Sequence, residues 1–429
     1  MKPIIILSLA LLAVSAAAQD APRRLTIMQC YEQAREHYPL TKRYGLIAQT
    51  ESYNVANAGK GLLPQLTLNA RATYQSDITK LPLDADRLSA IIPGFSIPTV
   101  SKDQYQMTAE LSQVLWDGGN VRWARALSHA QAEIERRQLD ADLYMLNERV
   151  NQVYFGCLLQ DELLLQNALL QKELRLNIER VQAMINNGLA NDHDRERLEV
   201  ELLNAAQRET GLEAARQAYL AVLRALTGLP EGEELSLTVP ALPGLSSPAK
   251  ISRPELAVLD ARDNMAETQR RQTGAGVMPR IGLFLQGGYG RPGLNMLEDS
   301  FEPFYVAGVR LSWSLGNFYT LKNDRRRIDA SRHMVDVQRE TFLFLTSLQV
   351  IGQNADIDKI HKLLLSDGEI VRLRESIRKA AEAKLAGGVI SVSDLVSEIN
   401  AEDMARQALA THRIQLLAAV YDLLYTTNE

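Results

Sequence analysis

The sequence predicts an α+β membrane protein made mostly of long α-helices, with four β-strands per chain and an internal duplication. Three observations predict this fold class. A proline-free stretch over residues 120–186 repeats apolar positions in steps of three and four. Four segments of about 10 to 12 residues alternate apolar and polar side chains, as two-faced strands do. The order of these elements occurs twice along the chain.

Bulk composition excludes some classes of function. The 429 residues carry a formal charge of -5, which gives no reason to expect a nucleic-acid partner. The two cysteines, Cys30 and Cys157, lack metal-type spacing and are predicted to be packed thiols. His193 lies between two aspartates at a turn, without a further ligand at helical spacing, so we expect no metal and no cofactor. Nothing in the sequence indicates an enzyme.

The chain begins with the pattern of a secretory signal peptide. Residues 1–18 contain Lys2, an apolar core and a small-residue cleavage site. We expect the signal to be cleaved and the mature chain to start at Gln19. Beyond it, no apolar run reaches the 18 residues that a membrane-spanning helix requires, so a membrane-inserted form requires strands that close into a barrel.

The first repeat is assigned to residues 19–229. Thr26 is predicted to cap a helix to about His37, and a second helix leads to the motif Gly-x-Gly-x-x-Pro at residues 59–64. Two alternating strands follow, separated by a proline-containing loop over residues 76–102. The second strand ends in Trp-Asp-Gly-Gly at residues 116–119. The long helix after it would measure about 100 Å at 1.5 Å per residue.

A turn at Gly188 suits a left-handed helix end, and a return helix starts with Asp192 or Asp194 near its cap. The two helices should pack antiparallel as a hairpin. Residues 230–254 form a proline-rich linker with one short strand, and residues 255–429 repeat the order of helices, strands and turns of the first repeat. Gly-x-Gly-x-x-Pro returns at residues 274–279, and the second tip turn matches the first one, Gly188 to Asp194, over residues 388–394.

The strands have the length and pattern of membrane strands. A tilted strand crosses a bilayer with about 9 to 11 residues, apolar toward lipid and polar toward a water-filled interior. Arg71, Glu110 and Arg310 lie on the polar faces and are predicted to line the lumen. Four strands are too few to close, because the smallest bacterial barrels have about eight, so several copies must share one barrel. A soluble periplasmic coiled-coil binding or structural protein without a pore is the alternative.

Order and duplication of these motifs resemble the TolC-like outer membrane efflux proteins, over essentially the whole mature chain. The resemblance implies a homotrimer, with a 12-stranded β-barrel in the lipid of a Gram-negative outer membrane and a tunnel of 12 helices in the periplasm. It implies an exit duct of a tripartite efflux pump or type I secretion system, joined by a periplasmic adaptor (membrane fusion) protein to an inner-membrane transporter. Drug, metal-ion and protein cargo are all compatible with the sequence.

The resemblance also assigns site residues. The tips at Gly188-Leu189 and Gly388-Val389 resemble adaptor-docking ends. Asp394 matches an aspartate that lines the periplasmic constriction, with Ser397 and Glu398 nearby and Asp194 at the equivalent place in the first repeat. A ring of three Asp394 carboxylates would raise their pKa values and favour cations.

For Asp394 and Asp194, a plain helix-capping role is an equal alternative. The arginine and tyrosine that latch some family members are replaced by Ile390 and Leu385. A weak or apolar closure is therefore predicted.

Overall fold

The computed structural model describes residues 23–79, 91–93, 99–230, 235–244 and 250–428. The predicted signal peptide and most of the predicted loop between the first two strands lie outside these residues. The described chain divides into two compact units. One contains the described residues of the ranges 23–44, 137–257 and 339–428, and the other contains the described residues of the ranges 45–136 and 258–338. Each unit therefore combines parts of both sequence repeats.

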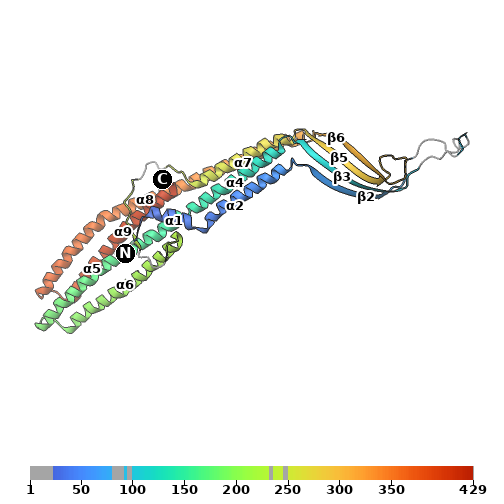
Figure 1. The fold of residues 1–429 in the computed structure, drawn as a ribbon. Helices are drawn as coiled ribbons and strands as arrows, with labels where there is room; N and C mark the ends of the chain where they lie inside the picture. Colours follow the sequence, from blue (N-terminus) through green and yellow to red (C-terminus); the bar gives the residue numbers. More distant parts are fainter. Residues whose placement is uncertain (1–22, 80–90, 94–98, 231–234, 245–249, 429) are drawn as a thin grey trace, which may run out of the picture. The chain divides into compact units, whose positions relative to one another are not determined.

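The predicted element order is found in both repeats (Figure 1). The first repeat contains α1, η1, α2, β2, β3, α4, α5 and α6, and the second contains α7, β5, β6, α8 and α9. Two short strands are also present. Strand β1 precedes the helices of the first repeat, and strand β4 lies in the linker. The bounds are β1 (Arg23–Leu25), α1 (Ile27–His37), η1 (Pro39–Lys42), α2 (Arg43–Lys60), β2 (Gln65–Tyr74), β3 (Asp103–Trp116), α4 (Asn120–Tyr144), α5 (Leu146–Asn186), α6 (Asp192–Thr227), β4 (Leu235–Leu237), α7 (Pro254–Gly276), β5 (Arg280–Arg291), β6 (Glu302–Ser312), α8 (Asn317–Ala386) and α9 (Val392–Thr427).

The prediction of one continuous helix over residues 120–186 is wrong in one respect, because the helix is interrupted at Met145 and forms α4 and α5. Met145 keeps helical angles, φ -61° and ψ -20°, and the sequence there contains neither glycine nor proline. Next to the break, the Tyr144 ring stacks on Tyr425 at 5.0 Å and its hydroxyl donates to the Tyr425 carbonyl. This long-range packing, which helical periodicity does not reveal, coincides with the interruption.

The four predicted strands form one antiparallel sheet in the order β2-β3-β5-β6 (Figure 1). Residues paired across the sheet share a face, so the register tests the predicted alternation. Leu68, Ala109, Gly287 and Tyr305 lie in one row, and Thr67, Glu110, Gln286 and Val306 lie in the next row on the opposite face. The predicted apolar and polar faces are therefore confirmed. Strands β2 and β6 are the two edges of this sheet.

The unit that contains residues 137–257 is called the helical unit below. A hydrophobic core of this unit lies between α1, α5, α6 and α9. Cys30 and Cys157 are both free and buried there, as predicted, and burial raises the pKa of each thiol to about 12. The hydroxyl of the fully buried Tyr154 lies 2.9 Å from the Leu25 carbonyl oxygen and 2.6 Å from that of Thr238. Tyr154 thus ties β1 and the end of β4, which pair in parallel, to α5.

The predicted helical hairpin of α5 and α6 is present, with buried seam residues such as Leu174, Val181 and Leu198. Gly156 lets the helices approach closely, since a Cβ atom there would lie 2.7 Å from the Tyr219 ring. On α6, Val222 is 38% exposed, whereas Leu223, four residues after Tyr219, is buried. Among the described residues, no helix combines the length and the apolar character needed to cross a membrane.

Candidate functional site

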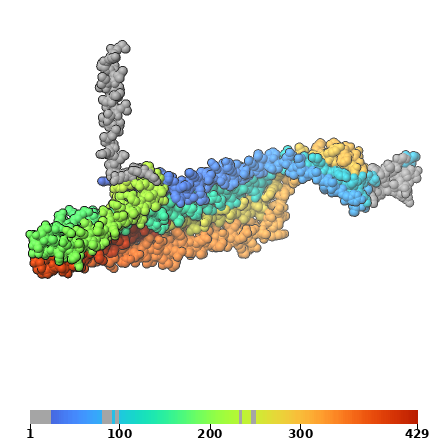
Figure 2. Space-filling view, turned by 90° about the horizontal axis from the view of Figure 1, so that it is seen from below, coloured from blue at the N-terminus to red at the C-terminus, as the bar shows by residue number. Residues whose placement is uncertain are grey.

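The two hairpin tips are built alike and lie at the same end of the helical unit (Figures 1 and 2). Gly188 and Gly388 adopt left-handed angles, with φ of 74° and 71°. After each glycine, the backbone N–H of Leu189 or Val389 donates over 2.9 Å to a carbonyl five residues earlier, which closes the helix end. The side chains of Leu189 and Val389 are 71% and 73% exposed. Each tip therefore presents one apolar side chain to its surroundings.

Both predicted aspartates cap the helices that leave the tips. Asp194 and Asp394 occupy the third position of α6 and α9 and form capping boxes with Asn191 and Ser391. The Asp394 carboxylate accepts a 2.7 Å hydrogen bond from the Ser391 hydroxyl and a 2.9 Å bond from its backbone N–H. These bonds lower the pKa of Asp394 below its ordinary value of 3.8. Capping, one of the two alternatives for these residues, is present in the single chain.

The other predicted gate residues lie on α9 in the next turn. Ser397 is exposed, and Glu398 is half-buried with an ion pair of 3.4 Å to Arg374 on α8. Leu385 is buried and Ile390 partly buried in an apolar cluster with Leu395. Within one chain, the positions of the missing latch are thus occupied by apolar packing. The predicted closure between copies stays a prediction.

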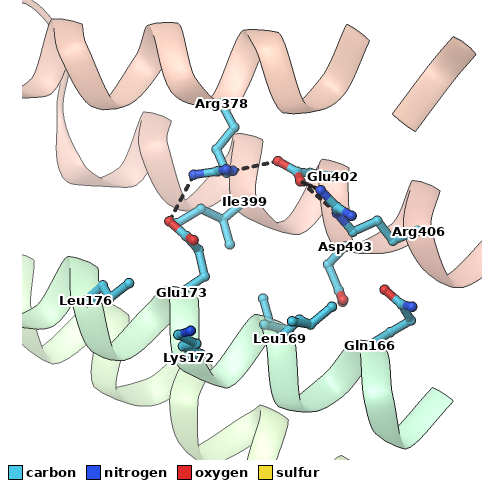
Figure 3. A pocket seen from close by; sticks show the side chains of 11 residues that line it. Gln166, Leu169, Lys172, Glu173, Leu176, Arg378, Ile399, Glu402, Asp403 and Arg406 are labelled. Atoms are coloured by element: carbon cyan, nitrogen blue, oxygen red, sulfur yellow. Dashed lines mark hydrogen bonds and ion pairs between the residues drawn. The ribbon is translucent and has the colours of Figure 1, made fainter. Parts of the chain in front are cut away.

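A charged cluster that the sequence did not predict lies within 20 residues of the tip glycines along the chain. Arg378 of α8, only 11% exposed, contacts carboxylates on three helices, of which Figure 3 shows Glu173 and Glu402. Its Nη1 lies 2.9 Å from Glu173 of α5 and contacts Glu382 of α8, while Nε lies 2.5 Å from Glu402 of α9. Arg378 therefore joins α5, α8 and α9 by charge-assisted hydrogen bonds.

A second layer of arginines completes this cluster. Arg406 contacts the other oxygen of Glu402 at 2.6 Å, and Arg208 of α6 contacts Asp403 at 2.8 Å. Glu402 and Asp403 are each 7% exposed at the side chain. Burial raises the pKa of Asp403, although Arg208 acts in the opposite direction. Burial also raises the pKa of Glu173, helped by the neighbouring Glu382 and opposed by Arg378.

The cluster borders a cavity of about 370 Å³ between α5, α8 and α9 (Figure 3). Leu169 and Leu176 line its α5 side, and Ile399 lines its α9 side. Sequence reasoning missed the cluster because arginines and glutamates at helical spacing usually form a solvated face. One signal was available: the α9 seam of Leu395 and Ile399 continues in a step of three to Glu402, which places an acid at a core position.

The predicted lumen residues share the polar face of the sheet. Arg310 on β6 reaches across β5 to Glu110 on β3, with Nη1 and Oε1 3.2 Å apart. Arg71 on β2 donates to the Gln106 side chain over 3.3 Å. The structure thus brings Glu110 and Arg310 together and keeps Arg71 apart from them. In the described parts of the chain, no group of three or more His, Cys, Asp or Glu side chains is arranged to hold a metal ion.

The fold is that of channel-forming outer membrane proteins. The chain is similar to CusC, with a TM-score of 0.66, 14% identity and coverage of 96% of this chain and 95% of CusC. It is also similar to MtrE of Neisseria gonorrhoeae, with a TM-score of 0.63, 17% identity, and coverage of 94% and 88%. VceC of Vibrio cholerae matches with a TM-score of 0.61, 16% identity, and coverage of 94% and 95%. At these identities the likeness establishes the fold.

The sequence itself carries a family match. Residues 33–229 match the family described as Outer membrane efflux protein. The match covers most of the first predicted repeat, where it supports the resemblance predicted from the sequence, and it favours an efflux protein over a soluble coiled-coil protein. The family is one of transport proteins and not a class of enzymes. No curated protein sequence matches the chain.

The substitution Arg378→Gln should lower the free energy of unfolding by about 3 kcal/mol, because it removes the arginine partner of the half-buried Glu173 and one of the two arginines that contact the buried Glu402. The loss should shrink as the pH falls from 7 toward 5. The pKa of Glu173 is raised, so its carboxyl takes up a proton in the folded chain more readily than in the unfolded chain and sheds the unpaired charge. Urea unfolding at both pH values measures this change.

Arg372→Gln is the matched control, because Arg372 and its partner Glu369 are 66% and 56% exposed on the same helix. It should leave stability unchanged. Equal effects of the two substitutions, or an Arg378→Gln loss that does not depend on pH, would contradict a buried charge cluster that joins the three helices.

Proposed function

We propose that three copies of the chain assemble into an outer membrane exit duct for a tripartite efflux pump or a type I secretion system. The observation that carries this proposal is a four-stranded sheet with one exposed apolar face and with two edges that no described strand of the chain pairs with. Unpaired edges and a wide apolar face are both unfavourable in water. When copies join edge to edge in lipid, the edge strands gain hydrogen-bond partners and the apolar face lies against lipid.

The strand directions allow such joining. Each neighbouring pair in the order β2-β3-β5-β6 is antiparallel, so β2 and β6 run in opposite directions. The β6 edge of one copy can therefore pair antiparallel with the β2 edge of the next copy. Three copies give a closed barrel of 12 strands, whereas one copy falls below the roughly eight strands of the smallest bacterial barrels.

The two faces of the sheet fit lipid outside and water inside. The outer face would carry exposed apolar side chains such as Leu68 (64%), Val309 (67%) and Leu285 (48%). Tyr74, Tyr105, Tyr289 and Tyr305 are exposed as well and lie near the strand ends, where aromatic girdles meet the membrane interface. The inner face would carry Arg71, Glu110 and Arg310 in water.

The helical hairpins would supply the periplasmic part of the duct. Two hairpins per chain give 12 helices in a trimer. The exposed Leu189 and Val389 at the tips offer apolar contacts to a periplasmic adaptor, which would link the duct to an inner-membrane transporter. Asp394 would then lie at the narrow periplasmic end, where three carboxylates favour cations.

The rival, a soluble periplasmic coiled-coil protein, would have to cover the apolar face of the sheet by other means. We expect the purified protein to require detergent and to sediment with the mass of three mature chains. In planar bilayers it should produce conducting pores. A monomer that is soluble without detergent would eliminate the duct.

A matched pair on β2 sharpens this test. Leu68→Lys puts a charge on the proposed lipid face and should prevent assembly, at a cost of about 2–4 kcal/mol per chain. Thr67→Lys, one residue earlier, puts the same charge on the proposed water-filled side and should assemble normally. Equal assembly of both variants would contradict the assigned faces.

The gate assignment makes a separate prediction. Asp394→Ala should reduce the cation preference of the pores, and Ser397→Ala should leave it unchanged. Capping by Ser391 lowers the pKa of Asp394, and repulsion within a ring of three carboxylates would act in the opposite direction. Reversal-potential measurements in a salt gradient give the cation preference of each variant. Unchanged cation preference in Asp394→Ala would contradict the assignment of a ring of Asp394 carboxylates at the periplasmic end.

A further inference from the structure

A second cavity lies on the polar face of the sheet, beside the first turn of α4. Its volume is about 380 Å³, which is within the range of small-molecule sites. Residues of β3, β5 and β6 line it, together with Asp117 and Asn120 at the start of α4. All of them belong to one compact unit. The cavity is separate from the tips and from the charged cluster around Arg378.

Two arginines give this cavity a cationic side. Arg280 pairs with Ser312 across β5 and β6, and Arg310 pairs with Gly282, so the two arginines are diagonal neighbours on one face. Diagonal neighbours lie about 7–8 Å apart, a spacing that lets both guanidinium groups contact one anion. Arg310 is 59% exposed and has an ion pair with Glu110. Arg280 is exposed and has no ion pair within the described chain.

An aromatic ring lies next to these arginines. Phe284 is on the polar face between Gly282 and Gln286, where the alternation of the strand would place a polar residue. The guanidinium carbon of Arg310 lies 4.7 Å from the ring centroid. Gly308 makes room for the ring, since a Cβ atom there would come within 3.0 Å of it. The polar face thus combines the aromatic ring of Phe284 with the guanidinium groups of Arg280 and Arg310.

One acid, Asp117, also lines the cavity, but its oxygens are engaged by backbone donors. Oδ1 accepts from Gly119 N over 2.7 Å, and Oδ2 accepts from Val121 N over 2.6 Å. The Asn120 amide donates to the Asp117 carbonyl and the Ser112 hydroxyl lies 3.5 Å from the Gln65 carbonyl oxygen, whereas the Ser312 hydroxyl adds a donor group at the cavity. Arg310 shares its charge with Glu110, so Arg280 supplies the positive charge beside Phe284 that has no carboxylate partner within the described chain.

We propose that this cavity binds organic anions that carry an aromatic ring, with a carboxylate or sulfonate between Arg280 and Arg310 and the ring against Phe284. This inference rests on the proposed function, because it makes the cavity a cargo subsite on the water-filled side of the barrel. Bidentate guanidinium contacts give affinity for the anionic group. The Phe284 ring selects a flat apolar body over a small inorganic anion.

The test measures binding to the full-length protein purified in an uncharged detergent, by isothermal titration calorimetry. The probes are naphthalene-2-sulfonate and a naphthalene of the same size that carries an ammonium group, each with a blank in detergent alone. The sulfonate should bind and the ammonium compound should not. Arg280→Gln should weaken sulfonate binding at least about tenfold, the loss expected from one charge-assisted contact of about 1.4 kcal/mol.

Arg71→Gln is the matched control, because Arg71 lies on the same face but outside the cavity. It should bind the sulfonate like the unmodified chain. Equal binding of both probes, or sulfonate binding that Arg280→Gln leaves intact, would overturn the site. The calorimetric binding assay does not depend on pore formation. A protein that conducts ions but does not bind the sulfonate therefore refutes this site alone. A binding protein without conductance refutes the duct alone.

Discussion

The backbone hydrogen bonds that β2 and β6 cannot make within one chain are the constraint on which the rest of the structure depends. Each edge strand has about half of its N–H and C=O groups directed away from its partner strand. In water such edges invite uncontrolled pairing, and in lipid each unsatisfied group costs several kcal/mol. The opposite directions of the two edges provide a solution, since identical copies can close the sheet on itself.

The helical unit follows from the same duplication. Each repeat ends its outgoing helix with a left-handed glycine and starts its returning helix with a capping box, at Asp194 and at Asp394. Equivalent local chemistry therefore builds two hairpins. The hairpins are then held together by unequal means, apolar near the tips around Leu395 and ionic around Arg378. Because the ionic part is buried, its loss is costlier than the loss of surface ion pairs.

Much of this architecture could be predicted from the sequence, because its strongest signals are local. Strand alternation fixed the two faces of the sheet, and glycine positions located both tip turns. The elements that could not be predicted depend on contacts between distant residues. The break at Met145 lies next to the packing of Tyr144 on Tyr425, and the Arg378 cluster brings together residues of three helices. The pattern of α9 places the acid Glu402 at a core position, but it does not identify the residues on other helices that contact it.

The central claim is that β2 and β6 pair with each other between copies. Amide hydrogen exchange of the assembled protein in detergent tests it most directly, because slow exchange requires a hydrogen-bonded N–H. The account predicts that the amides of β2 and β6 exchange as slowly as those of the central strands β3 and β5. Rapid exchange along β2 and β6, with slow exchange confined to β3 and β5, would contradict it.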